Sequence, residues 1–163
     1  MEELFKDFYI VGLHTGFFKV STIGDCYLPT SGLPDIRYDH AEVMAKFSVE
    51  CQKIFEVVTT ELSYTLGSET IDLKLQCGLN SGPVTTGFLW GLLSRFEIFV
   101  DTFNTASRME SNGIPTRIQL SRATTDLLIK SGIESLVKPI EGCIVANGKG
   151  QMQTYWLTMT DFH

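Results

Sequence analysis

The sequence predicts an α+β domain of ferredoxin-like type, with an antiparallel sheet that carries helices packed on one face. Amphipathic helical patterns alternate with short apolar runs that have hairpin-type turns between them. The chain has 163 residues, 44% of them hydrophobic, which is enough for one buried core. Since no linker, repeat or low-complexity segment interrupts it, residues 1–163 are predicted to form a single domain.

The first half is predicted to contain a helix, a hairpin and a longer helix. Residues 1–14 have apolar side chains at mostly helical spacing. Strands over 17–22 and 26–31 flank the turn Ile23-Gly24-Asp25, which places an acidic residue at a hairpin tip. A capping box of Asp39 and Glu42 starts the next helix. Its apolar face consists of Met44, Phe47, Cys51, Ile54, Val58 and Leu62.

The second half alternates strands with shorter helices. Strands are predicted over 71–79, 84–89 and 96–100, with a break at Ser81-Gly82-Pro83. A helix over 102–111, a strand over 117–120 and a capped helix over 121–130 follow. The tail from 137 to 158 is predicted to form short strands around Asn147-Gly148-Lys149-Gly150. We expect the sheet face opposite the helices to be free for a partner.

Composition argues against several classes of partner. Thirteen basic and nineteen acidic residues give a net charge of −6, which provides no basic surface for nucleic acid or an anionic membrane. No stretch approaches the roughly 20 apolar residues of a membrane span. The four cysteines form no C-x-x-C pair, which favours reduced thiols. We therefore expect a cytoplasmic domain, free or inside a larger membrane protein, with no nucleic acid and no direct membrane contact.

A few residues could carry chemistry, and each also has a purely structural interpretation. Asp25 could bind a metal ion or simply favour a turn. Lys149 lies between two glycines, as in a phosphate-contacting loop or an ordinary hairpin turn. Asn104, Arg108 and Ser111 share a helix face that could hold a ligand or only contact solvent. Zinc and nucleophilic catalysis are disfavoured because no ligand spacing or triad involves His14, His40 and His163.

Several segments follow one another in a specific order. They are KVSTIGDCY at 19–27, SGLP at 31–34, HA at 40–41, GLNSGPV at 78–84, DTFNTASRMES at 101–111, GKG at 148–150 and TYW at 154–156. In order and spacing they resemble the catalytic domain of class III adenylyl and guanylyl cyclases. The resemblance covers nearly the whole chain and is far more specific than any single motif.

The resemblance implies a reaction and a set of roles. Two divalent cations, Mg²⁺ or Mn²⁺, assist the ribose 3′-hydroxyl of a nucleoside triphosphate in attacking the α-phosphate, and pyrophosphate leaves. Asp25 matches a metal-binding aspartate. Asn104 matches the residue that positions the ribose, and Arg108 the one that neutralises charge on the α-phosphate. Lys149 matches the lysine that holds the terminal phosphates.

The resemblance assigns purine recognition to Ser21 and Glu97. Ser21 fits neither the adenylyl nor the guanylyl pattern, whereas the carboxylate of Glu97 can accept a hydrogen bond from the adenine amino group. Facing guanine O6, the same carboxylate would oppose a second acceptor at a cost of about 1–3 kcal/mol. ATP is therefore the expected substrate. GTP is the alternative, because residues 104–111 and 150–157 are similar to receptor-type guanylyl cyclases.

One part of the family pattern has no match in this chain. The family carries its first metal-binding aspartate on a strand before the opening helix, and Asp7 lies in the wrong register to replace it. We therefore expect the domain to lack the first strand, leaving a sheet edge that a second copy could cover by domain swapping. The family's sites lie between two domains, which implies a homodimer with active sites at its interface. The alternative is a catalytically silent regulatory or dimerisation domain.

Overall fold

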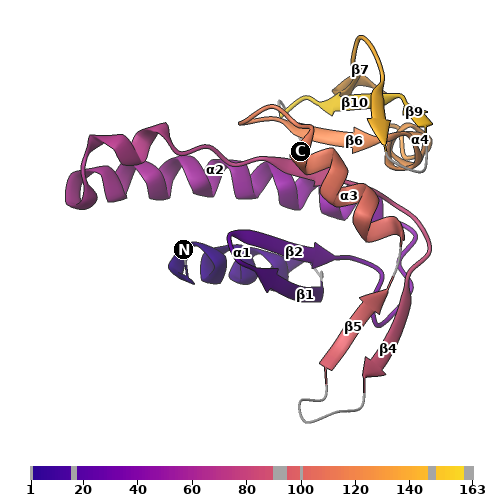
Figure 1. Ribbon diagram of the computed structural model, residues 1–163, viewed down its shortest axis with the longest axis horizontal. Coiled ribbons are helices and arrows are strands. Elements are labelled where there is room, and N and C mark those ends of the chain that lie inside the picture. The colour runs from indigo at the N-terminus through magenta and orange to yellow at the C-terminus, as the bar shows by residue number, and fades with distance from the viewer. Residues whose placement is uncertain (1, 16–17, 90–94, 100, 147–149, 160–163) are drawn as a thin grey trace.

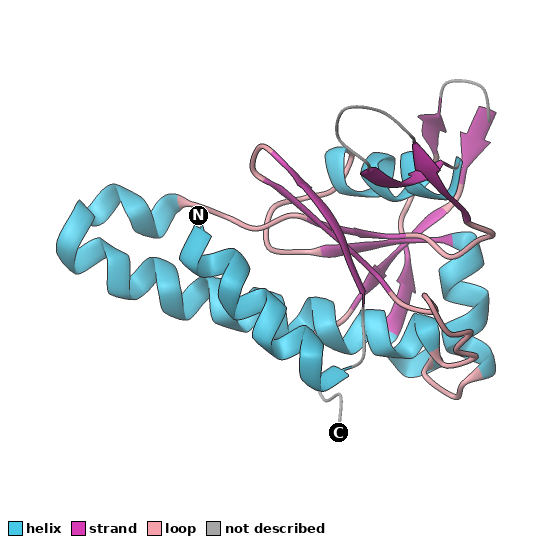
Figure 2. Cartoon of the chain, turned by 90° about the horizontal axis from the view of Figure 1, so that it is seen from below, coloured by secondary structure: helices cyan, strands magenta, loops and turns pink. Residues whose placement is uncertain are grey.

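The protein, described here from a computed structural model, is arranged around one long helix (Figures 1 and 2). The largest sheet lies on one side of this helix, and the opening helix and the first hairpin lie on the other. The structure describes residues 2–15, 18–89, 95–99, 101–146 and 150–159. The helices are α1 (Glu2–Thr15), α2 (His40–Leu66), α3 (Asp101–Ser111) and α4 (Arg122–Lys130), with short 3₁₀ turns η1 (Ser68–Asp72) and η2 (Glu134–Leu136). The strands are β1 (Phe18–Ile23), β2 (Cys26–Thr30), β3 (Cys77–Leu79), β4 (Thr85–Leu89), β5 (Arg95–Phe99), β6 (Ile118–Ser121), β7 (Val137–Pro139), β8 (Ile144–Ala146), β9 (Gly150–Met152) and β10 (Thr154–Leu157).

The largest sheet has four strands in the order β3-β6-β10-β7. Three hairpins, β1–β2, β4–β5 and β8–β9, pair antiparallel beside it. Within the four-stranded sheet β10 runs antiparallel to β6 and β7, whereas β3 runs parallel to β6. The expected antiparallel sheet therefore includes one parallel pair. In Figure 1 the β4–β5 hairpin extends away from the rest of the molecule.

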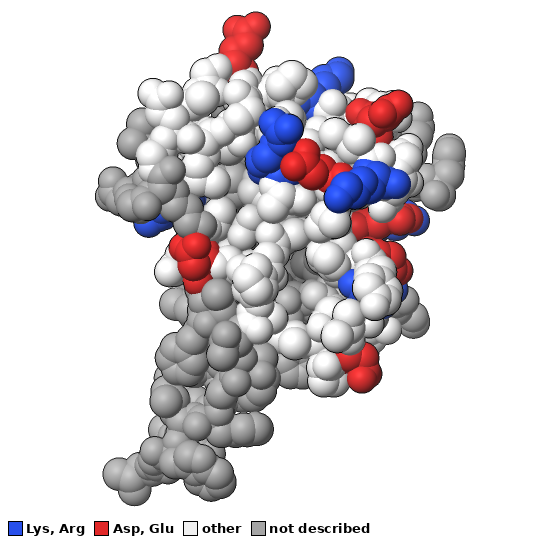
Figure 3. Space-filling model, turned by 90° about the vertical axis from the view of Figure 1, so that its right-hand side faces the viewer, with Lys and Arg blue, Asp and Glu red and all other residues white. Residues whose placement is uncertain are grey.

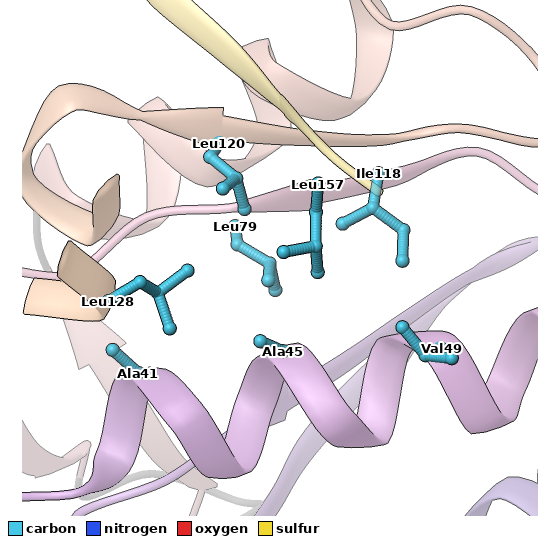
Figure 4. Packing of buried hydrophobic residues seen from close by; sticks show 8 residues of the cluster. All are labelled: Ala41, Ala45, Val49, Leu79, Ile118, Leu120, Leu128 and Leu157. Carbon is cyan, nitrogen blue, oxygen red and sulfur yellow. The ribbon is translucent and has the colours of Figure 1, made fainter. Parts of the chain in front are cut away.

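One hydrophobic cluster joins this sheet to α2 and α4. Its buried residues point toward one another from both layers in Figure 4. Ile118, Leu120 and Leu128 are completely inaccessible to solvent. The small side chains of Ala41 and Ala45 on α2 allow the strands to approach that helix closely. The full cluster is Ala41, Ala45, Val49, Leu79, Ile118, Leu120, Leu128 and Leu157.

A second cluster lies between α2, α1 and the β1–β2 hairpin. Phe8 of α1 is 2% exposed, and its ring meets the ring of Tyr27 on β2 edge-on at a centroid distance of 5.7 Å. Phe47 and Cys51 contribute from α2. The hairpin that ends in Asp25 is thus held on the helical layer by aromatic packing.

The sheet is covered on both faces at β3 and β6. Successive strand residues point to opposite faces, and Leu79 faces α2 while Gly78 lies against the backbone of α3. Gln119, the register partner of Gly78 on β6, is only 1% exposed. Helices α2 and α4 occupy one face as expected, and α3 covers part of the face that the sequence left free for a partner.

Most predicted elements are confirmed, including the opening helix, the hairpin around Gly24 and Asp25, and the short strands of the tail. Ser121 caps α4 as predicted, its hydroxyl accepting a hydrogen bond from the backbone nitrogen of Thr124 at 3.3 Å. The amphipathic face predicted for α2 is the one that packs against α1. The alanine face toward the sheet was not anticipated.

Two local predictions are wrong. The strand over 71–79 is confined to Cys77–Leu79, because η1 occupies its beginning and Ile71 and Leu73 remain exposed. The capping box at Asp39 and Glu42 does not form, since Asp39 makes no side-chain cap. Its carboxylate instead accepts two hydrogen bonds from Arg37, at 3.0 and 2.8 Å. The guanidinium of Arg37 thereby lowers the pKa of Asp39.

Candidate active site

Asp25 lies at the tip of the β1–β2 hairpin, as the second residue of a two-residue loop that begins with Gly24. Ile23 pairs with Cys26 across this loop. Gly24 has a φ of +60°, which is the glycine-favouring conformation of the first loop position in tight hairpins. The aromatic packing of Tyr27 fixes the base of the hairpin. The carboxylate of Asp25 is therefore solvent-exposed on a backbone that is anchored nearby.

Asp25 lies close enough to α3 to act on it electrostatically. Burial raises the pKa of the half-buried Glu110 carboxyl on α3, and the negative charge of Asp25 raises it further. The pKa of the Cys26 thiol is raised as well, first by burial and then by the charges of Glu110 and Asp25. The hairpin tip and this side of α3 thus form a locally negative region that favours a cation.

Helix α3 carries Asn104 and Arg108 four residues apart, so their side chains leave the helix from the same face. Asn104 is exposed and Arg108 is half-buried. A neighbouring face, about 100° around the helix, anchors it through Met109, which is fully buried, and Thr105, which is 3% exposed. An amide and a guanidinium are donors suited to ribose hydroxyl and phosphate oxygens.

Arg108 and Glu110 leave α3 on different sides, because two residues correspond to about 200° around a helix of 3.6 residues per turn.

Three predicted site residues have side chains that lie outside the described part of the structure. Ser21 lies on β1 opposite Leu28, and Glu97 lies on β5 opposite Gly87. The roles predicted for Ser21 and Glu97 depend on their side chains, which are outside the described part of the structure. Lys149 lies outside the described residues as well, between β8 and β9 in the sequence.

The donor chemistry near Asp25 fits a hard divalent cation, because carboxylate oxygens are the ligands preferred by Mg²⁺ and Mn²⁺. Asp25 is exposed and reinforces a negative region. Among the described residues, no three His, Cys, Asp or Glu side chains gather closely enough to hold a metal ion. Asp7 does not supplement Asp25 there, since it lines a groove between α1 and α2 together with Lys53 and Glu61.

The described surface agrees with the composition. In Figure 3, basic and acidic side chains are interspersed on the face shown, without an extended patch of one sign. Within the helices described, none is both long and apolar enough to cross a lipid bilayer. Cys26, Cys51, Cys77 and Cys143 are free thiols.

Comparison with known proteins identifies the class that this fold defines. The sequence profile of the adenylate and guanylate cyclase catalytic domain matches residues 1–159. Receptor-type guanylate cyclase gcy-28 of Caenorhabditis elegans is 38% identical over 94% of this chain, and human guanylyl cyclase C is 35% identical over 97%. These alignments span only 12% and 14% of the two relatives. The chain thus corresponds to a small part of each.

Solved structures agree with the sequence comparison. The guanylate cyclase domain of RhGC from Catenaria anguillulae, in complex with GTP, is 31% identical with a TM-score of 0.77, over 96% of this chain and 80% of that one. The adenylyl cyclase CyaB from P. aeruginosa has a TM-score of 0.85 at 19% identity, over 99% of this chain and 81% of that one, which reflects the shared fold. The chain belongs to the class III adenylate and guanylate cyclase catalytic domain family.

Sequence reasoning missed the residues that support α3. Glu110 lies inside the matched segment at 101–111 but was assigned no role, and Asn80 and Thr102 were not considered. Glu110 carried one usable signal, since it is an acidic residue two positions after Arg108, the residue predicted to contact phosphate. The contacts of Asn80 and Thr102 join distant segments and gave no local pattern.

Proposed function

We propose that this chain is a nucleotidyl cyclase domain that converts a purine nucleoside triphosphate to its 3′,5′-cyclic monophosphate and pyrophosphate. The observation that carries the proposal is the match of the cyclase catalytic-domain profile to residues 1–159, within which Asn104 and Arg108 share one face of α3. In the arrangement that the family resemblance implies, the site is built from two chains, of which one supplies Asp25 and the other supplies Asn104, Arg108 and Lys149. A symmetric homodimer would contain two such sites.

In this proposal each side chain acts on a defined part of the substrate. Asn104 hydrogen-bonds the ribose and holds its 3′-hydroxyl in line with the α-phosphate. Arg108 donates to the α-phosphate oxygens, where negative charge grows as the new P–O bond forms and the bond to pyrophosphate breaks. Lys149 pairs with the terminal phosphates of the leaving pyrophosphate. The proton of the 3′-hydroxyl passes to solvent.

Asp25 would hold the divalent cations of the site, Mg²⁺ or Mn²⁺. When bound, these ions supply positive charge that stabilises the attacking and leaving oxygens. We propose that Asp25 is the contribution of residues 1–163 to the metal site. The negative region around Asp25 and Glu110 supports cation binding.

The identity of the purine rests on two opposing observations. The carboxylate of Glu97 favours the adenine amino group and therefore ATP. The curated relatives described above are guanylate cyclases, which favours GTP. We propose ATP as the substrate on the basis of Glu97, with GTP as the alternative.

The dimer is also proposed to cover an open sheet edge. Among the described strands, β3 pairs only with β6, and β1 and β2 pair only with each other. Each leaves backbone groups that an added strand could satisfy. A second copy could supply that strand by domain swapping, and the assembly would act in the cytoplasm, free or within a larger membrane protein. A chain that stays monomeric at high concentration would contradict the swapped dimer.

The decisive assay measures cyclic nucleotide formation from ATP and from GTP with Mn²⁺ or Mg²⁺. It compares residues 1–163 with a form extended at the N-terminus by the strand that precedes this segment in a family relative. Activity that disappears in Asp25→Ala and in Arg108→Ala, and returns when these two inactive variants are mixed, supports a site shared between chains. No recovery on mixing would contradict the shared site.

The second candidate is a catalytically silent regulatory or dimerisation domain. The observation that favours it is the single metal-binding aspartate matched in the sequence. Folded, dimeric protein that forms no cyclic nucleotide in either form would establish this alternative and overturn the cyclase proposal.

A further inference from the structure

The beginning of α3 is held by the segment that connects β3 to β4. The side-chain nitrogen of Asn80 donates a hydrogen bond to the carbonyl oxygen of Thr102 at 2.9 Å. The hydroxyl of Thr102 in turn donates to the carbonyl oxygen of Pro83 at 2.6 Å. These two bonds run in opposite directions between the same two segments, so α3 can neither slide nor rotate there without breaking one of them.

Close packing reinforces the two hydrogen bonds. A methyl group at Gly82 would lie 2.6 Å from the hydroxyl oxygen of Thr102, so the connecting segment approaches α3 as closely as a glycine permits. At the other end of the helix, Gly78 allows the same close approach to the backbone of Ala106 and Glu110.

The connecting segment is itself fixed to the core. The hydroxyl of Thr124 on α4 donates to the hydroxyl of Ser81 at 3.1 Å, and it lies 3.3 Å from the hydroxyl of Ser121. Thr124 and Ser121 are 1% and 2% exposed. Neighbouring residues of the connecting segment thus contact two elements, Ser81 the buried start of α4 and Asn80 the start of α3 at Thr102.

Thr102 precedes Asn104 by two residues, within the same helical turn. We infer that Asn80 and Thr102 are positioning residues that set the placement of Asn104 relative to the ribose, without touching the substrate. This inference rests on the proposed cyclase function. In an active site, a displacement of about 1 Å at a reacting group can lower the rate roughly a hundredfold. Loss of one of the two hydrogen bonds is expected to lower the rate about tenfold.

The test uses Thr102→Val, which removes the hydroxyl and keeps the shape, and Thr102→Ser, which keeps the hydroxyl. Both variants are made in residues 1–163 or in the N-terminally extended form, whichever of the two shows cyclase activity. We expect Thr102→Val to lower kcat about tenfold with KM nearly unchanged, and Thr102→Ser to retain most of the parent rate. Thr60→Val is the control. The Thr60 hydroxyl also donates to a backbone carbonyl, that of Glu56 at 2.7 Å, but at an exposed position of α2.

The readout that separates positioning from general stability is a double-mutant cycle with Asn104→Ala. If Thr102 acts through Asn104, the double variant has about the rate of Asn104→Ala alone. Losses that multiply would overturn the inference, as would a Thr102→Val variant with the parent rate. Asn80→Ala, whose side chain is only partly buried, provides a second variant with the same expectation if Thr102→Val folds poorly.

The outcomes distinguish this inference from the proposed function. If Asn104→Ala has the parent rate, the assignment of the ribose-binding residue fails. If Asn104→Ala is impaired while Thr102→Val and Asn80→Ala are not, only the positioning role fails. A protein silent in both forms overturns the proposed function and this inference with it.

Discussion

Gly78 of β3 lies directly against the backbone of Glu110 on α3, and a methyl group at Gly78 would overlap the Glu110 amide nitrogen. The carbonyl oxygen of Ala106 would lie 2.5 Å from the same methyl group. Both obstacles are backbone atoms, which cannot rotate away as a side chain can. The position of the helix that carries Asn104 and Arg108 therefore depends on the absence of a side chain at Gly78.

Gly78→Ala is expected to lower the free energy of unfolding by about 3 kcal/mol, at the upper end of the usual range for overpacking. Gly132→Ala is the control, since nothing lies near its Cβ position and only its φ of +82° is unfavourable, at a cost of about 1 kcal/mol. Urea denaturation measures both. Equal losses in the two variants would show that α3 can move away from β3 without penalty.

Arg108→Ala is expected to lower kcat by about 10²–10³-fold, the usual cost of removing one donor that stabilises transition-state charge. The variant is expected to fold, because Arg108 is only half-buried and belongs to neither hydrophobic cluster. Ser107→Ala, an exposed change on the same helix, should retain the parent rate. Steady-state kinetics with the preferred triphosphate compares the two variants with the parent. Full activity in Arg108→Ala would remove that residue from the site.

Leu128→Ala is expected to destabilise the domain by about 2–5 kcal/mol, because it leaves a cavity in the cluster that joins α4 to α2. The neighbouring Ile129 is 43% exposed, so Ile129→Ala should cost less than about 1 kcal/mol. Equilibrium denaturation of the two variants compares a buried and an exposed side chain on one helix. A loss of similar size in both would contradict the packing of α4 on α2.

The cysteines are expected to react at very different rates. Burial raises the pKa of Cys77 to about 12 and also raises that of Cys51. A raised pKa lowers the fraction of reactive thiolate at every pH below it. At pH 8 alkylation should therefore modify the exposed Cys143 at least a hundredfold faster than Cys77. Peptide mass spectrometry follows the reaction, and in urea the rates should become similar. Equally fast labelling of the half-buried Cys77 in the native protein would contradict its raised pKa.

The sequence was sufficient to predict elements whose signals are local. The hairpin at Gly24 and Asp25, the cap at Ser121 and the short strands of the tail all follow from adjacent residues. The strand over 71–79 failed because an apolar run cannot form a strand without a neighbour to pair with, and only its end reaches β6. Asp39 failed as a cap because Arg37 competes for its carboxylate.

The candidate site was predictable as a set of residues but not as an arrangement. The family resemblance pointed to Asp25, Asn104 and Arg108 as one group. That the charge of Asp25 raises the pKa of Glu110 depends on how the hairpin packs near α3. The alanine face of α2 was missed for a related reason, since Ala41 and Ala45 give a weak apolar signal until the strands above them are placed.

Helix α2 has two buried faces along its first half, one against the sheet and one against α1, whereas its last turns extend beyond both layers (Figure 1). Tyr64 and Leu66 near its end are 86% and 72% exposed. Backbone amides exchange with solvent deuterium only when their hydrogen bonds open. Exchange along this one helix should therefore be graded, slowest near Ala45 and Val49 and fastest near Leu66. A single helix would thus contain both strongly protected and readily exchanging amides.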